Sequence, residues 1–208
     1  MKADSKSRWI DSALVLDGTL IRLEPLQAAH ARELFAVAGD EDIWRYLLFD
    51  LPRSVSDMQQ FIGLAERARD LGSAVPFIIR DVHSGTAIGS TRFLEINAED
   101  RNLAIGWTWL GRAWWRTGAN LESKYLLLRH AFEAAGAIRV QIKADERNKR
   151  SLRAIEQLGA VREGVLRQHR ILKDGYRRTS VIYSILDFEW PAVKEQLEAR
   201  LAGARPTP

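Results

Sequence analysis

Apolar residues along the chain recur with two different periods. Leu121, Tyr125, Leu128, Phe132 and Ala135 follow one another at spacings of four, three, four and three. This period predicts an amphipathic helix, which the following glycine ends. Further helices are predicted over 27–38, 56–69, 151–158 and 190–201, and a serine at 54 or 56 is the expected N-cap of the second of these.

Shorter apolar or alternating runs predict the strands. Residues 14–16 and 19–23 flank Asp17 and Gly18, which is a hairpin-type turn signal. Other runs with strand character are 75–79, 87–96, 103–110, 139–143, 164–172 and 177–186. The order of hairpin, helices, antiparallel strands, helix, strand, helix and two strands predicts a mixed α/β fold of the α+β type.

The length of 208 residues fits one domain over 1–208, with a core of about 16–188 and a terminal helix over 190–201. We find no repeat or linker that would divide the chain. Cysteine is absent, which excludes disulfides, thiolate metal sites and a cysteine nucleophile, and which agrees with a cytoplasmic location.

Charge and hydropathy narrow the choice of partners. The longest nearly uncharged apolar stretch, 103–111, is too short to span a bilayer, and the charged start has no signal-peptide character. We therefore expect no membrane partner and no export. A net charge of +4 suits an anionic ligand and is weak for a dedicated nucleic-acid binder.

Common catalytic signatures are missing from the sequence. It contains no GxGxxG, GxxxxGK[ST], GxSxG or HExxH pattern. The four histidines, at 30, 83, 130 and 169, have no paired ligand spacing, so we expect no metal site.

A distinctive block runs from Ile105 to Asn120, between a predicted strand and the long helix. A glycine at 118, free backbone N–H groups and the helix dipole would together form an anion cradle. The alternative is an ordinary cap, with Asn120 at the N-cap and Glu122 or Ser123 in the first turn. The spacing alone leaves both interpretations open.

Asn148 and Ser151 open the next predicted helix among basic residues. They form either an N-cap on a solvated turn or a contact for a ligand that crosses from the first cradle.

Four segments in order resemble the GNAT superfamily of acetyl-CoA-dependent N-acetyltransferases. They are Gly-Trp-Thr-Trp-Leu at 106–110, Trp-Arg-Thr-Gly-Ala-Asn at 115–120, Asn-Lys-Arg-Ser at 148–151 and Leu-Gly-Ala at 158–160. The likeness covers about 16–188 and is greatest to the branch typified by the ribosomal-protein N-terminal acetyltransferases RimJ and RimL.

The resemblance implies a mostly antiparallel sheet whose fourth and fifth strands, 103–110 and 139–143, splay apart to admit pantetheine. It assigns main-chain contacts with pantetheine and the thioester carbonyl to Thr108, Trp109 and Leu110. It also makes Ser151 the candidate general acid. The remaining cofactor-binding residues that it implies are Trp115, Arg116, Thr117, Gly118, Ala119, Asn120 and Asn148.

The sequence departs from the family pattern at two kinds of position. Trp115 and Asn120 replace the usual Gln/Arg and small residue of the diphosphate loop. Ala104 stands where the fourth strand often carries a carboxylate, so the general base is unassigned and Glu95 on the preceding strand is a substitute candidate.

The implied acceptor is a primary amine, either a protein N-terminal α-amine or a small free amine such as a polyamine, amino acid or aminoglycoside. The resemblance makes Trp44, Tyr46 and Phe49 candidate walls of the acceptor site, although aromatic residues at these positions also suit a plain core. Dimers are common in the related branch, so a homodimer is an open alternative.

A reading of another class is a non-catalytic RNA- or ribosome-binding module. It rests on the basic residues of the second half, namely Arg147, Lys149, Arg150, Arg153, Arg167, Arg170, Arg177 and Arg178. Such a module would bind with an affinity that falls steeply with salt.

Overall fold

The computed structural model describes residues 9–172 and 174–203 and contains one eight-stranded sheet in the order β1-β2-β3-β4-β5-β6-β8-β7. The segment 1–8, from which we expected no export signal, lies outside the described residues. The strands are β1 (Leu16–Asp17), β2 (Ile21–Pro25), β3 (Ala74–Asp81), β4 (Ala87–Asn97), β5 (Asn102–Leu110), β6 (Arg139–Asp145), β7 (Val161–Ile171) and β8 (Arg177–Leu186). All neighbouring pairs are antiparallel except β5 and β6. The predicted mixed, mostly antiparallel fold is therefore confirmed.

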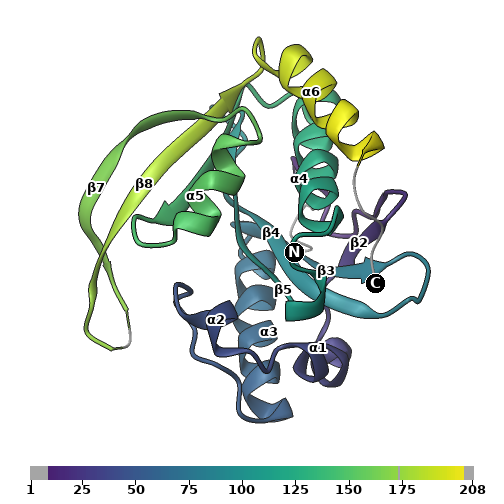
Figure 1. Ribbon diagram of the computed structural model, residues 1–208, viewed down its shortest axis with the longest axis vertical. Coiled ribbons are helices and arrows are strands. Elements are labelled where there is room, and N and C mark those ends of the chain that lie inside the picture. Colours follow the sequence, from purple (N-terminus) through teal and green to yellow (C-terminus); the bar gives the residue numbers. More distant parts are fainter. Residues whose placement is uncertain (1–8, 173, 204–208) are drawn as a thin grey trace, which may run out of the picture.

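Helices cover both faces of the sheet. They are α1 (Ala31–Val37), α2 (Glu41–Trp44), α3 (Val55–Asp70), α4 (Ala119–Arg129), α5 (Lys149–Glu156) and α6 (Trp190–Ala202), with short 3₁₀ turns at Ala28–His30 and Arg112–Trp114 and a π-helical turn at His130–Ala134. In Figure 1, α4 and α6 lie above the sheet and α1 to α3 lie below it.

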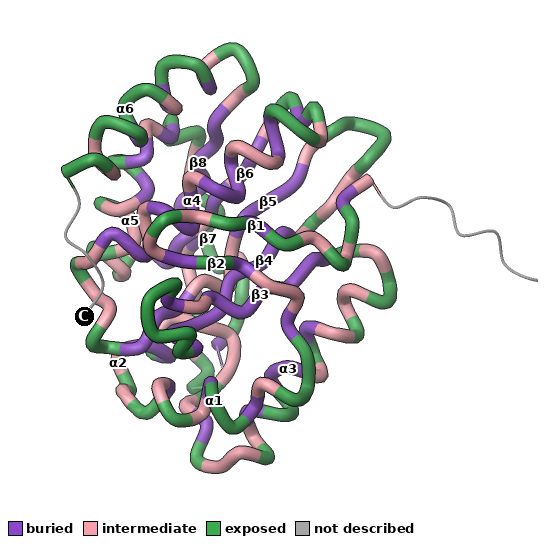
Figure 2. Tube along the Cα trace, turned by 90° about the vertical axis from the view of Figure 1, so that its right-hand side faces the viewer, coloured by how far each residue is buried: buried purple, intermediate pink, exposed green. Residues whose placement is uncertain are grey.

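Two apolar clusters correspond to these two layers. One includes Leu127 of α4 and Leu197 of α6, and the other includes Leu34 of α1 and Phe61 of α3. Figure 2 shows the buried residues concentrated in the central strands, with exposed helix surfaces around them. Burial of one stripe of each helix against the sheet explains the 3.6-residue period seen in the sequence.

Local signals set the helix boundaries. Ser54 accepts a hydrogen bond from the backbone of Asp57, whose side chain bonds back in a capping box, so the first of the two predicted serine caps is confirmed. The long predicted helix is α4 and its π-turn, and Gly136, at a φ of 67°, follows it. α2, a single turn capped by Asp40, was not predicted because four residues show no period.

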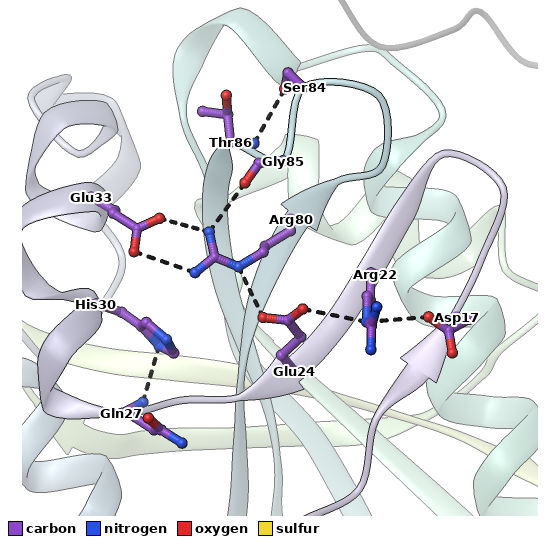
Figure 3. Close-up of polar contacts among 10 residues, drawn as sticks. All are labelled: Asp17, Arg22, Glu24, Gln27, His30, Glu33, Arg80, Ser84, Gly85 and Thr86. Atoms are coloured by element: carbon purple, nitrogen blue, oxygen red, sulfur yellow. Dashed lines mark hydrogen bonds and ion pairs between the residues drawn. The ribbon is translucent and has the colours of Figure 1, made fainter.

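Ion pairs tie α1 to the edge of the sheet. Arg80 of β3 donates to Glu24 of β2 at 2.9 Å and to Glu33 of α1 at 2.6 Å (Figure 3). Glu24 in turn lies 3.3 Å from Arg22. This network fixes α1 on β2 and β3.

Candidate active site

The central feature of the site is the point where β5 and β6 separate. Their parallel pairing joins only Asn102–Ile105 to Arg139–Ile142. β5 continues to Leu110 and β6 to Asp145, but β6 there pairs only with β8. The backbone of β5 from Gly106 onward thus has no strand partner on the β6 side.

A β-bulge deforms β5 within this unpaired segment. The register with β4 changes from Arg92 opposite Gly106 to Ser90 opposite Trp109, so two residues of β5 oppose one of β4. Trp107 adopts a φ of 50°, in the left-handed region that a tryptophan rarely occupies. Such bulges redirect backbone groups and side chains beside functional sites.

Side chains hold the bulge from the α4 side of the sheet. Thr108 Oγ1 lies 2.8 Å from Thr91 Oγ1, and Lys124 Nζ of α4 donates to Thr108 Oγ1 at 2.5 Å. Lys124 is buried, and this burial lowers its pKa to about 7. Sequence reasoning missed Lys124, although a lysine three residues after Leu121 and four before Leu128 stands out on an apolar helix face.

The loop between β5 and α4 presents free backbone N–H groups. Trp115 Nε1 donates to the carbonyl of Leu110 at 2.8 Å, and Arg116 takes a φ of 63°. The N–H groups of Gly118, Asn120 and Leu121 have no hydrogen-bond partner within 9–172 and 174–203. Such groups, with the helix dipole, form a site for an anion.

The capping alternative for this loop is wrong in its N-cap residue and right in placing Glu122 in the first turn. α4 begins at Ala119 with Gly118 as the N-cap, and not with Asn120. Thr117 Oγ1 accepts from the backbone of Ala119, and Ser123 Oγ donates to the carbonyl of Asn120. The hydroxyl oxygen of Thr117, one residue before the N-cap, thus accepts from the N–H of Ala119, the first residue of α4.

Glu122 lies in the first turn of α4, and its side chain turns into the protein. Its carboxylate accepts from Thr19 N and Oγ1, Leu20 N and Ile21 N at 2.7 to 2.9 Å. These four bonds fasten the β1–β2 hairpin to α4.

The start of α5 lies against this loop. The Arg150 guanidinium lies 3.4 Å from the centroid of the Trp115 ring, and that of Arg112 lies 4.3 Å from it. The two segments predicted to bind the coenzyme are therefore neighbours, and both bring positive charge. Asn148 is the N-cap of α5, and its side chain accepts from Ser151 N at 3.0 Å.

Glu95 of β4 reaches β6 near the point where β5 and β6 separate. It has a φ of 52° in β4, and both of its carboxylate oxygens accept from Lys143 Nζ at 2.6 Å. Lys143 is the first residue of β6 beyond the parallel pairing. The structure thus places Glu95 beside the separation point, in an ion pair.

The three predicted wall residues have different environments. Trp44 is buried, donates to the carbonyl of Ala38 and packs against Phe49 and Phe61, so it belongs to the core. Tyr46 is half-buried, and its carbonyl accepts from Arg178 of β8 at 3.3 Å. The segment that follows α2 thereby meets the curved β7–β8 hairpin (Figure 1).

Neither a metal-binding group nor a membrane-spanning helix is found in the described part of the chain. Residues 9–172 and 174–203 contain no group of three or more His, Asp or Glu side chains arranged for a metal ion. In the same residues, no helix combines the length and apolar character needed to cross a bilayer.

Comparisons with known proteins agree on one family. The family model described as acetyltransferase (GNAT) domain matches residues 21–161. The crystal structure of a GCN5-related N-acetyltransferase from Brucella melitensis superposes with a TM-score of 0.85 at 29% identity, over 91% of this chain and 86% of that one.

Two further relatives extend the comparison. The uncharacterized N-acetyltransferase p20 of Bacillus licheniformis is 24% identical over 153 residues, which are 74% of this chain and 85% of p20. The microcin C7 self-immunity acetyltransferase MccE, solved with acetyl-CoA and AMP, has a TM-score of 0.72 at 22% identity, over 81% of this chain and 93% of MccE. At that identity the likeness to MccE concerns the fold.

Proposed function

The chain belongs to the GNAT family of acetyltransferases, and from this premise we propose that it transfers an acetyl group from acetyl-CoA to a primary amine. The observation that carries the proposal is the separation of β5 from β6 next to the free N–H groups that open α4. One opening thus offers hydrogen bonds to an extended arm and an anion cradle at its end. The coenzyme supplies the acetyl group as an activated thioester.

In this proposal the diphosphate of the coenzyme binds at the start of α4. The N–H groups of Gly118, Asn120 and Leu121 bind its oxygens, and Arg116 and Arg150 add positive charge. The segment 115–120 acts mainly through its main chain. Asn148 supports the neighbouring wall as the cap of α5.

The backbone of β5 binds the pantetheine arm and the thioester. Thr108, Trp109 and Leu110 lie in the segment that has no β6 partner, so their backbone groups on that edge are available to a ligand, except the Leu110 carbonyl, which accepts from Trp115. A main-chain donor near Leu110 stabilises negative charge on the thioester oxygen. The N–C bond forms, the attacking amine loses a proton to water, the C–S bond breaks, and Ser151 protonates the departing thiolate and regains a proton from water.

The proposed acceptor is an α-amine, which needs only a weak base. At pH 7 roughly one α-amine in ten is neutral, against about one lysine side chain in 2,500. Glu95, the candidate base, is paired with Lys143, and Ala104 supplies no carboxylate from β5. A protein N-terminal α-amine, as in the RimJ/RimL-like branch, meets this demand, and a small free amine is the alternative acceptor.

Thermal-shift titration with acetyl-CoA tests the proposal. At 100 times its dissociation constant the ligand adds about 2.7 kcal/mol to the free energy of unfolding. Acetylpantetheine, which lacks the diphosphate, is the matched control and should shift the melting temperature much less. No shift at millimolar acetyl-CoA would contradict the proposal.

A further inference from the structure

Buried hydrogen-bond donors without acceptors lie on β4 and β5, on the side of the sheet that α3 covers. Ser90 Oγ, Arg92 Nε, Arg92 Nη2 and Trp109 Nε1 are all buried and have no hydrogen-bond partner within 9–172 and 174–203. We call these atoms the donor cluster. They are four of seven such side-chain atoms in the described residues.

The members of the donor cluster share one face of the sheet. Ser90 and Trp109 are directly opposite in the β4–β5 ladder, so their side chains point to the same side. The ring of Phe61 from α3 lies 5.5 Å from the Arg92 guanidinium and 6.3 Å from the Trp109 ring. Phe61 thus lies near both Arg92 and Trp109.

Within the described residues, no carboxylate serves as a counter-ion for the charge of Arg92. The residue is only 5% exposed, burial alone lowers its pKa to about 10, and no carboxylate contributes to the shift. Its neighbours are aromatic rings, with Trp107 at 4.5 Å and Phe61 at 5.5 Å. A buried charge and unpaired donors both destabilise a fold. This arrangement therefore indicates that a ligand binds to the donor cluster when the protein is active.

Because the donor cluster offers hydrogen-bond donors, the ligand that it binds must supply acceptors. A guanidinium fork, an indole N–H and a hydroxyl together match the lone pairs of a carboxylate. A second cation in this place would be repelled, which argues against polyamines and aminoglycosides.

The donor cluster borders the reacting centre. Arg92 lies opposite Gly106, where β5 leaves β6, and Trp107 of the bulge covers the guanidinium. Trp107 is half-buried whereas Arg92 and Trp109 are buried, so the tryptophan is the outer member of the group. A ligand bound here has its carboxylate on the α3 side of the strand that would hold the thioester.

We propose that the donor cluster of Ser90, Arg92 and Trp109 binds a carboxylate of the acceptor, which makes the acceptor an amine that also carries a carboxylate, such as a free α-amino acid. This inference rests on the proposed function. Pairing with Arg92 neutralises the carboxylate, which lowers the pKa of the nearby ammonium and yields more of the attacking neutral amine.

Binding of the acetylated product tests the cluster without turnover. The probes are N-acetyl-L-leucine, N-acetyl-L-phenylalanine and their amides at 10 mM in thermal-shift assays. We expect the acids to raise the melting temperature and the amides to leave it unchanged. The shift should disappear in Arg92→Met and Ser90→Ala and persist in Arg32→Met, which alters an exposed arginine of α1. Should Arg92→Met not fold, Arg92→Lys, which keeps the charge without the fork, takes its place and should weaken the shift.

Acceptor selection supplies the second measurement. Release of coenzyme A thiol is followed with L-leucine, L-leucinamide and 3-methylbutylamine, which differ only in the carboxylate. We expect kcat/KM for the amino acid to exceed those for the other two by about 100-fold, and Arg92→Met to remove the preference. Equal rates, or a preference that survives Arg92→Met, would overturn the inference, as would equal shifts by acids and amides. The proposed function has its own failure, which is the absence of acetyl-CoA binding.

Discussion

Lys124 Nζ lies 2.5 Å from Thr108 Oγ1, so a buried amine of α4 holds the bulged strand that borders the proposed coenzyme arm. Burial lowers the pKa of this amine to about 7, from 10.5 for an ordinary lysine. Between these two values the unfolded chain binds more protons than the folded one. The free energy of unfolding should therefore rise with pH, by up to about 1.4 kcal/mol per unit.

The variant Lys124→Met should lose this pH dependence and be more stable than the wild type at pH 7, because no buried amine then resists protonation. Urea unfolding at pH 7, 8 and 9 measures both effects. Lys149→Met, an exposed change at the start of α5, is the control. An unchanged slope in Lys124→Met would show that the amine is not the group that titrates.

Glu122→Gln should loosen the β1–β2 hairpin. The carboxylate accepts four hydrogen bonds, two of them from Thr19, and an amide would turn a donor toward N–H groups. We expect a loss of about 2–3 kcal/mol in the free energy of unfolding. The exposed Glu99→Gln should change it little, and a similar loss in both variants would refute the specific role of Glu122.

Gly89→Ala should prevent folding or cost several kcal/mol, because the added Cβ would lie 2.1 Å from the carbonyl oxygen of Trp109. Gly39→Ala, where a Cβ meets nothing within 4 Å, is the matched control. Circular dichroism melting curves of the two variants make the comparison. Equal melting temperatures would mean that β4 and β5 are not this close.

Acid should weaken the Arg80 network (Figure 3). A hydrogen bond from Arg80 lowers the pKa of Glu33 below its usual 4.5, so the stability from this bond is present above 4.5 and is lost as pH falls through the lower, folded value. Urea unfolding at pH 7 and pH 3.5 should show a smaller acid loss in Arg80→Met than in the wild type. Equal losses of stability in Arg80→Met and the wild type would show that the Arg80–Glu33 pair does not contribute to the acid sensitivity.

Ser151→Ala tests the proposed general acid. Turnover should fall about 10- to 100-fold while the affinity for acetyl-CoA stays nearly constant, because Ser151 donates its backbone N–H to Asn148 and alanine keeps that bond. Steady-state kinetics and calorimetry separate the two quantities. An unchanged kcat would remove Ser151 from this role.

The sequence predicted most elements because burial imposes a period on them. Leu121, Leu128 and Phe132 marked α4, and Gly136 marked its end. The bulge at Trp107 was not predictable, since it depends on the register between β4 and β5. The donor cluster was missed for the same reason: Ser90 and Trp109 are adjacent only through the ladder.

In the part of the chain that the structure describes, only four ladder pairs connect β1–β5 to β6, β8 and β7. The sheet therefore consists of two parts, β1–β5 and β6, β8 and β7, that are joined over a short length. A coenzyme that binds along the open edges of β5 and β6 would bridge the two parts of the sheet. Binding of the coenzyme should therefore slow backbone amide hydrogen exchange in β6 far more than in β3.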